Sequence, residues 1–375
     1  MKTIDLTCEL NILPINDFKE KLAPEYIYLP INDNSTLYIS IPSKVLKDDL
    51  IVKTDNVNYF ASVSGEAITY TTINEKKYIQ IKNDYLENSS FNGHSKNLNK
   101  MTKNVFLNMI NDSLITEKMD KKIGTLYINC IEDEPYFFNN YIYLKHNMEE
   151  VLDTCKALLS IFELKKIVLL IKQNYQSLIT NYIVTISEYG SLEMLTLPNI
   201  YPIGNKKLIR SSVKHNENDE FLDLKDLIKI IYKAKKGKIN DIKYFTINGN
   251  AIKEPVVFIA KKQQLLKELL NDIEIIKNDY TFTLNNSLCG DNITNKDLVI
   301  DDSTNGIIIN EKSNEISLPC NNCGLCYNVC PMKINPLENN SKCIKCGLCN
   351  YVCPMKINIV KGYQENEFSN QNKDN

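Results

Sequence analysis

The chain has 375 residues, of which 43% are apolar and 24% are charged, as in an ordinary globular protein of two or three domains. Lys and Arg number 44 against 46 Asp and Glu, so the basic excess of a protein that binds nucleic acid is missing. No apolar run approaches the ~20 residues that span a bilayer. The N-terminal MKTIDLTCELN lacks the apolar core of a secretory signal, so we expect a cytoplasmic protein.

The first ninety residues predict a β-rich domain. Several blocks alternate apolar and polar residues or are rich in β-branched and aromatic residues, with Asn, Asp and Ser turns between them. These blocks are YIYLPI (26–31), TLYISI (36–41), DLIVKT (49–54) and NYFASVSGEAITY (58–70). The polar, aperiodic residues 87–100 then predict a linker.

From about Thr102 the apolar residues recur at longer, helix-like spacings, with short apolar runs between them, and this pattern predicts an α/β domain. Residues 105–115 predict a helix, 125–131 a short strand, 148–164 an amphipathic helix and 165–172 a buried strand. The β-α-β order implies a parallel sheet.

A further helix is predicted over residues 219–236. Asp219 and Glu220 would open it, and a lysine run before Gly237 would complement the dipole at its end rather than bind nucleic acid. Its apolar face would contain Phe221, Leu224, Leu227, Ile228 and Ile231.

The following segment returns to strands. Residues 242–260 predict two strands joined at Asn248-Gly249, a helix is expected over 262–277, and TNGIIIN (304–310) then precedes the cysteine cluster. The polar tail, residues 361–375, is expected to be disordered.

Cysteine carries the strongest signal. Of 12 cysteines, eight lie between Cys320 and Cys353, and in a chain of this length without an export signal that density indicates metal ligands rather than disulfides. The remaining four are expected to be small buried apolar residues: Cys8, Cys130, Cys155 and Cys289.

The eight clustered cysteines form a tandem repeat. Residues 320–335 (CNNCGLCYNVCPMKIN) and 343–358 (CIKCGLCNYVCPMKIN) are identical at 12 of 16 positions with an offset of 23. Each copy has the C-x2-C-x2-C-x3-C-P spacing of bacterial ferredoxins with two 4Fe–4S clusters. Gly324 and Gly347 would let the backbone wrap closely around each cluster.

In this arrangement the fourth cysteine of each copy ligates the other cluster. We therefore predict two ligand sets, the first being Cys320, Cys323, Cys326 and Cys353, and the second Cys343, Cys346, Cys349 and Cys330. A pair of zinc sites is the alternative. Zinc sites usually separate two cysteine pairs by a dozen or more residues, and His94, His146 and His215 offer no ligand pair.

Short motifs in a fixed order add a resemblance. They are LPI (29–31), ASVSGEA (61–67), INCIEDEPY (128–136), YPIGNKKLI (201–209) and TINGNAIKEP (246–255), with NGIIIN leading into the cysteine repeat. In this order the chain resembles the RnfC-like family of Rnf-type electron-transport complexes, which is related to the NADH-binding subunit of respiratory complex I.

The resemblance implies a multidomain α/β protein. Its domains would be a β barrel-sandwich (1–90), a Rossmann-like α/β domain similar to the complex I 51K subunit (101–238), a β-grasp domain (239–312) and a ferredoxin-like dicluster domain (316–360), before the tail (361–375). It also implies electron transfer between NAD(H), with FMN beside Glu132 and Glu134, and partner proteins of a ferredoxin-linked, ion-translocating complex. The subunit would be peripheral on the inner face of the cell membrane, held there by its partners.

The sequence departs from this family at the nucleotide site. The family places a glycine-rich loop between a helix and the strand before Glu132, where this chain has LITEKMDKKIG (114–124). In such a loop, glycines let the backbone N–H groups approach a phosphate closely. Lys118, Lys121 and Lys122 could supply positive charge but not this backbone conformation. Two interpretations stay open: Glu132 and Glu134 lie beside a flavin or nicotinamide, or they are capping or solvated carboxylates in an electron-transfer adaptor that feeds a partner reductase.

Overall fold

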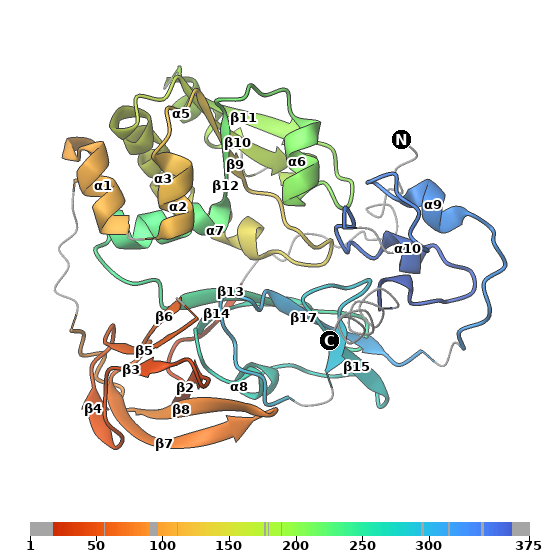
Figure 1. The fold of residues 1–375 in the computed structure, drawn as a ribbon, viewed down its shortest axis with the longest axis horizontal. Helices are drawn as coiled ribbons and strands as arrows, with labels where there is room; N and C mark the ends of the chain where they lie inside the picture. Colours follow the sequence, from red (N-terminus) through yellow and green to blue (C-terminus); the bar gives the residue numbers. More distant parts are fainter. Residues whose placement is uncertain are drawn as a thin grey trace, which may run out of the picture.

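The computed structural model describes residues 18–361, apart from 56, 91–96, 111, 176–177, 179, 189, 294–295, 314–315 and 339–340. Cys8, His94 and all but the first residue of the predicted tail lie outside the described residues. The described strands form four sheets, and the parallel sheet among them confirms the multi-sheet α/β class (Figure 1).

Two antiparallel sheets form the N-terminal part of the chain. Ile27, Leu29, Ile51, Ile79 and Ile81 meet in their common core because alternate side chains of each strand point inward. One sheet contains β2 (Tyr26–Ile31), β8 (Lys76–Asn83), β7 (Gly65–Ile73) and β4 (Ser43–Val45). The other contains β3 (Thr36–Leu37), β5 (Leu50–Thr54) and β6 (Val57–Phe60). The β-rich character predicted for this region is confirmed, although TLYISI supplies only the two-residue β3.

A four-stranded parallel sheet follows, in the order β11-β10-β9-β12. Its strands are β9 (Thr125–Asn129), β10 (Lys166–Lys172), β11 (Leu192–Leu197) and β12 (Glu220–Asp223). The long helix α3 (Asn139–Ile161) connects β9 to β10, and these strands pair in parallel, which confirms the predicted β-α-β unit.

Helices cover both faces of this sheet (Figure 1). Leu126 and Ile128 face a core shared with most of the helices, whereas Tyr127 between them faces α6 (Lys206–Ser212) on the other side. The first group of helices consists of α1 (Lys103–Ile110), α2 (Ser113–Met119), α3, α7 (Leu224–Ile230) and the π-helix η3 (Ile231–Lys235). Shorter helical elements are η1 (Leu98–Lys100), η2 (Gln173–Tyr175) and α5 (Ile183–Glu188).

The helix expected over 219–236 was wrong at its beginning. Residues Glu220–Asp223 form β12, and the helical part begins only at Leu224. Phe221 stacks on Tyr127 across the sheet with ring centroids 4.7 Å apart, so it belongs to a strand face and not to a helical stripe. The helix expected over 105–115 is likewise divided, because Asp112 caps α2 by accepting a hydrogen bond from the N–H of Ile115.

A six-stranded mixed sheet lies between the N-terminal sheets and the parallel-sheet domain (Figure 1). In spatial order it contains β1 (Phe18–Lys21), β14 (Val256–Lys261), β13 (Ile242–Asn248), β17 (Gly306–Glu311), β15 (Tyr280–Leu284) and β16 (Asp291–Ile293). The antiparallel pairing of β13 with β14 confirms the predicted strand-turn-strand.

The helix expected over 262–277 was wrong in length, because only α8 (Leu266–Leu270) forms. Long-range hydrogen bonds hold the residues before it in an extended conformation. The carbonyl of Gln263 accepts from the N–H of Tyr28 at 2.8 Å, and the Gln264 side chain donates to the carbonyl of Lys21 at 2.9 Å. Tertiary contacts of this kind override helix propensity.

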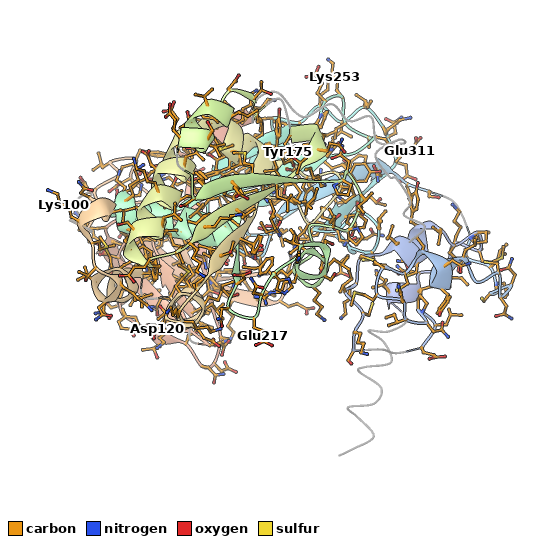
Figure 2. The ribbon with its side chains drawn as sticks, turned by 90° about the horizontal axis from the view of Figure 1, so that it is seen from above. Lys100, Asp120, Tyr175, Glu217, Lys253 and Glu311 are labelled. Atoms are coloured by element: carbon orange, nitrogen blue, oxygen red, sulfur yellow. The ribbon has the colours of Figure 1, made fainter. Side chains whose placement is uncertain are left out.

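The cysteine repeat folds as a separate segment at one end of the molecule. It contains two short helices, α9 (Leu325–Val329) and α10 (Leu348–Tyr351). In Figure 2 the segment projects beside the rest of the protein, beyond Glu311. None of the helices in the described part of the chain has the length and apolar character required to cross a bilayer.

Candidate functional site

The two cysteine loops have the same backbone conformation. Gly324 and Gly347 occupy the left-handed region at φ 72° and 77°, directly before α9 and α10. Two further pairs of residues separated by 23 positions share positive φ: Asn322 (56°) with Lys345 (52°), and Lys333 (54°) with Lys356 (54°). The sequence repeat is therefore also a structural repeat.

The first cysteine loop encloses a small cavity. Its volume is about 120 Å³, and Cys320, Cys323, Cys326 and Cys353 line it together. Three of these thiols come from the first copy of the repeat and the fourth from the second copy. Apolar side chains complete the wall, among them Leu337, Met355, Ile357 and Ile359.

The second loop is more enclosed. Cys349 is buried, and Cys343, Cys346 and Cys330 are partly buried. Burial raises the pKa of the Cys346 thiol to about 11, with further contributions from the nearby Cys330 and Cys343. Cys330 of the first copy thus lies within electrostatic reach of the second loop.

The donor set suits iron–sulfur chemistry in two respects. All donors are soft thiols, and the first cavity has an apolar wall in which uncompensated thiolates would be unfavourable without a cation. Within the described residues, no three His, Cys, Asp or Glu side chains converge closely enough to complete a metal site, so the ligand sets remain predictions.

A second, larger cavity of about 390 Å³ lies at the carboxyl end of β9. Ligands of open parallel sheets bind at this edge. The segment after Asn129 forms one wall, and the Asn129 amide donates to the carbonyl of Gly204 at 2.9 Å. A Cβ on Gly204 would lie 2.3 Å from the carbonyl oxygen of Glu132, so the INCIEDEPY and YPIGNKKLI motifs are packed directly together.

Glu132 lines this cavity and also caps a helix. Its carboxylate accepts hydrogen bonds from the backbone N–H groups of Asn140 and Tyr141 in the first turn of α3. Burial raises its pKa to about 7, and burial lowers the pKa of the nearby Lys172. The capping described in one of the two sequence interpretations is therefore present, on a side chain that still borders the cavity.

Glu134 connects the cavity to the second cysteine loop. Its carboxylate accepts from the N–H and hydroxyl of Ser287 at 3.0 and 3.1 Å, and burial raises its pKa to about 8. The Tyr201 hydroxyl lies 3.5 Å from Glu134 and donates to the carbonyl of Cys346 at 2.7 Å. Cys346 also lines the cavity, so the cavity and the second loop share a wall.

Ser287, Cys289 and Tyr143 were not anticipated as site residues. Cys289, expected to be a buried apolar residue, is only partly buried, and its Sγ lies 3.1 Å from the carbonyl of Lys345; Cys130 and Cys155 are buried as expected. Tyr143 is among the residues that line the cavity; its hydroxyl is buried, and it has no hydrogen-bond partner among the described residues.

The residues at the position of the glycine-rich loop do not form a phosphate cradle. Lys118 donates to the carbonyl of Phe221 at 3.0 Å and pairs with Asp226, and Lys121 pairs with Glu220 at 3.5 Å. These residues, and Lys122, are not among those that line the cavity. The aromatic and amide side chains that line the cavity suit a planar ring. No glycine is found among the described lining residues, so the close backbone approach that a flavin phosphate needs is not provided there.

Comparison with known proteins agrees with this geometry. Residues 114–224, which contain the parallel sheet and Glu132, match the family described as the Nuo51 FMN-binding domain. The chain is 26% identical to the C component of the ion-translocating oxidoreductase complex of Buchnera aphidicola (strain APS) over 352 residues, covering 84% of this chain and 74% of that protein.

Two further matches extend the comparison. The C component of the proton-translocating ferredoxin:NAD(+) oxidoreductase complex of Clostridium ljungdahlii is 22% identical, over 84% of this chain and 77% of that protein. A solved NAD+-reducing [NiFe]-hydrogenase in the air-oxidized state superposes with a TM-score of 0.46 at 11% identity, over 57% of this chain and 47% of that one.

The part of the chain that carries the parallel sheet and its edge cavity is similar to the Nuo51 FMN-binding domain, and the cysteine repeat follows it outside the matched residues. Over most of its length the chain is similar to C components of Rnf-type complexes, at 22–26% identity, which confirms the RnfC-like resemblance.

Proposed function

We propose that this chain is an electron-transfer subunit of an ion-translocating ferredoxin:NAD oxidoreductase complex, and that it passes electrons through two 4Fe–4S clusters. The cavity lined by Cys320, Cys323, Cys326 and Cys353 carries this proposal, because a cysteine of the second copy lines it beside three of the first, as the crossed ligation of dicluster ferredoxins requires. The names of the relatives in Buchnera aphidicola and Clostridium ljungdahlii support the assignment to such a complex.

Each part of the chain has a role in this proposal. The two loops would hold the clusters, which accept and release single electrons when bound. The second loop is held against the rest of the protein by the hydrogen bond from Tyr201 to the carbonyl of Cys346 and by that from Asn350 to the carbonyl of Leu288. Partner subunits would keep the chain peripheral on the inner face of the membrane.

A second function rests on the missing phosphate cradle. The chain would be an RnfC-like adaptor that has lost NADH and flavin binding, receives electrons from a partner flavoprotein and feeds a reductase. The contacts of Lys118 and Lys121 favour this alternative, because both ammonium groups already bind neighbouring carboxylates or carbonyls instead of lining the cavity. The cavity of about 390 Å³ beside Glu132 favours a bound ligand and hence the first proposal.

Metal analysis tests the part common to both functions. Protein purified without oxygen should contain about eight iron and eight sulfide per chain, as two cubanes require. A zinc-containing, colourless protein that is active in its biological role would contradict both proposals.

Titration with NADH and FMN then separates the two functions. Bleaching of the cluster absorbance by NADH, without any added diaphorase, would support the first function. If NADH has no effect while dithionite bleaches the clusters, the adaptor function is supported.

The crossed ligation has its own test. Cys353→Ser should damage the cluster held by the first copy, and Cys330→Ser, the matched variant, should damage the cluster of the second copy. Electron paramagnetic resonance distinguishes the two clusters. If each variant damages the cluster of its own copy, the crossing is wrong.

A further inference from the structure

A buried carboxyl group lies beside the second cysteine loop. Glu134 is 5% exposed, and its side chain accepts hydrogen bonds from the N–H and hydroxyl of Ser287 at 3.0 and 3.1 Å. Residues 286–290, which contain Ser287, also cover the second loop, because the Asn350 amide donates to the carbonyl of Leu288 at 3.2 Å. The Glu134 carboxyl group is therefore held by the same segment that packs on the second loop.

One tyrosine connects this carboxyl group to the second loop. The Tyr201 hydroxyl donates to the carbonyl of Cys346 at 2.7 Å and lies 3.5 Å from Oε1 of Glu134. Tyr201 is 7% exposed and packs against Leu348 of the same loop. A single side chain thus separates Glu134 from a residue of the predicted second ligand set, in a buried region where charges are screened less than in water.

The cavity of the first cysteine loop has a different wall. Apart from its cysteines and Tyr327, the described residues that line it are asparagine, glycine and apolar residues. No Asp, Glu, His, Lys or Arg is among these lining residues. The repeat therefore contains its own comparison: two loops of the same backbone conformation, one beside a buried carboxyl group and one whose described cavity wall has none.

We propose that Glu134 binds a proton when the cluster of the second loop is reduced, so that electron uptake at this loop, and not at the first, is coupled to proton uptake. This inference rests on the proposed function of the clusters. A reduced partner protein with a flavin or iron–sulfur centre supplies one electron and is itself oxidised, and solvent supplies one proton. An O–H bond forms on the Glu134 carboxylate, and reoxidation releases the electron and the proton together.

Burial is the main reason why Glu134 can hold a proton near neutral pH. Burial raises the pKa of this carboxyl group to about 8, against the lowering effect of the two hydrogen bonds from Ser287. The neighbouring Asp133 raises the pKa further, and the hydrogen bond with Tyr201 lowers it. One added negative charge at about 10 Å lowers the acidity of a carboxyl group roughly tenfold at an effective dielectric constant of about 20. Reduction of the second loop should therefore bind a proton at Glu134 over a pH range just above the pKa of this group in the oxidised protein.

Other charged groups face Glu134 or the cavity that it lines. Lys172, at the end of β10, and Cys289, in residues 286–290, lie within electrostatic reach of it. Burial raises the pKa of Glu132 to about 7 and lowers that of Lys243 to about 8, so both groups titrate in the same pH range. The remaining charged residues that line the cavity are Asp133, Asp223, Lys225, Lys229, Asp302 and Lys345. Removal of the Glu134 carboxyl group is therefore needed to separate its contribution from theirs.

Redox titrations of the full-length, anoxically purified protein, followed by electron paramagnetic resonance, test the inference. The signal that changes in Cys349→Ser belongs to the second loop. Its reduction equilibrium should become about tenfold less favourable between about pH 6 and about pH 10, which is about 59 mV for one electron, while that of the first loop should stay constant.

Three variants assign this pH dependence to one carboxyl group. Glu134→Gln should abolish it, and Glu134→Asp, which keeps a carboxyl group at the position, should preserve it. Glu268→Gln is the matched control. Burial raises the pKa of Glu268, on α8, to about 7, but this residue is not among those that line either cavity, so its replacement should leave the pH dependence intact.

Infrared difference spectra, reduced minus oxidised, provide a second measurement that requires no variant. Reduction at about pH 9 should produce the C=O band of a protonated carboxyl group, and Glu134→Gln should lack this band. If Glu134→Gln does not load iron, the wild-type spectrum decides: the band together with a pH-dependent second cluster supports the inference, and its absence overturns it.

The inference is also overturned by a second cluster with no pH dependence, by equal pH dependence of both clusters, or by a loaded Glu134→Gln variant that titrates like the wild type. Iron and sulfide are measured in every sample. Iron-free wild-type protein would overturn the proposed function as well, whereas loaded protein with any of these three results overturns only the coupling to Glu134.

Discussion

The tandem repeat provides a matched pair of glycines that measures how firmly the cysteine segment is attached to the body. We consider Gly324→Ala and Gly347→Ala. Both glycines are in the left-handed region, at φ 72° and 77°, so alanine should cost a similar amount of strain at each, about 1–2 kcal/mol.

The two variants differ in the steric cost of the added methyl group, because the two glycines have different surroundings. The new methyl group of Gly324→Ala meets no atom within 4 Å. The methyl group of Gly347→Ala would lie 2.6 Å from the Cβ of Leu288, 3.0 Å from its carbonyl carbon and 3.1 Å from the Cβ of Cys289. Overpacking of this kind costs roughly 1–3 kcal/mol in addition. Gly347→Ala should therefore lower the free energy of unfolding by that much more than Gly324→Ala does.

Two anoxic measurements on the loaded protein test this difference. The midpoint of thermal unfolding, followed by circular dichroism, should decrease more for Gly347→Ala than for Gly324→Ala. Limited proteolysis should release the segment after Glu311 faster in Gly347→Ala only. Equal midpoints and equal proteolysis rates would refute the conclusion that the second loop is packed against residues 286–290.

Three further predictions follow from the buried polar groups. Tyr201→Phe removes the 2.7 Å hydrogen bond to the carbonyl of Cys346 and should cost about 1–3 kcal/mol of stability in denaturant unfolding, while Tyr327→Phe, at an exposed side chain of the first loop, should be neutral. Burial raises the pKa of Glu134 from its ordinary 4.5 to about 8, so its contribution to stability is complete below pH 4.5 and is lost as the pH rises through 8. Glu134→Gln should therefore weaken the pH dependence of the unfolding midpoint between pH 4.5 and 8. An unchanged pH dependence would contradict the burial argument. Lys261→Met removes the 2.6 Å ion pair with the buried Asp241, which keeps only Lys47 at 2.8 Å, and should destabilise the protein by about 1–3 kcal/mol. Lys253→Met, at an exposed pair with Glu274, should leave the unfolding midpoint unchanged.

The cysteine spacing by itself predicted the chemistry of the C-terminal segment, because three soft ligands and a glycine within one short loop are a local requirement. Local periodicity likewise predicted the β-α-β unit and the antiparallel pair β13 and β14. The order of short motifs was sufficient for the family resemblance, which the comparisons confirm. These features depend on residues that are close together in the sequence.

Only the tertiary structure decided the features that depend on distant residues. Phe221 had the spacing of a helical stripe but stacks on Tyr127 in a sheet, and Gln263 and Gln264 are held extended by partners more than 200 residues away. The two cysteine loops are nearly identical in sequence, and yet one packs against Leu288 while the other meets open space. The shared spacing of cysteines and glycines does not distinguish them. Asn350, at the position of Tyr327 in the first copy, acquires its role only through the distant Leu288, whose carbonyl it contacts.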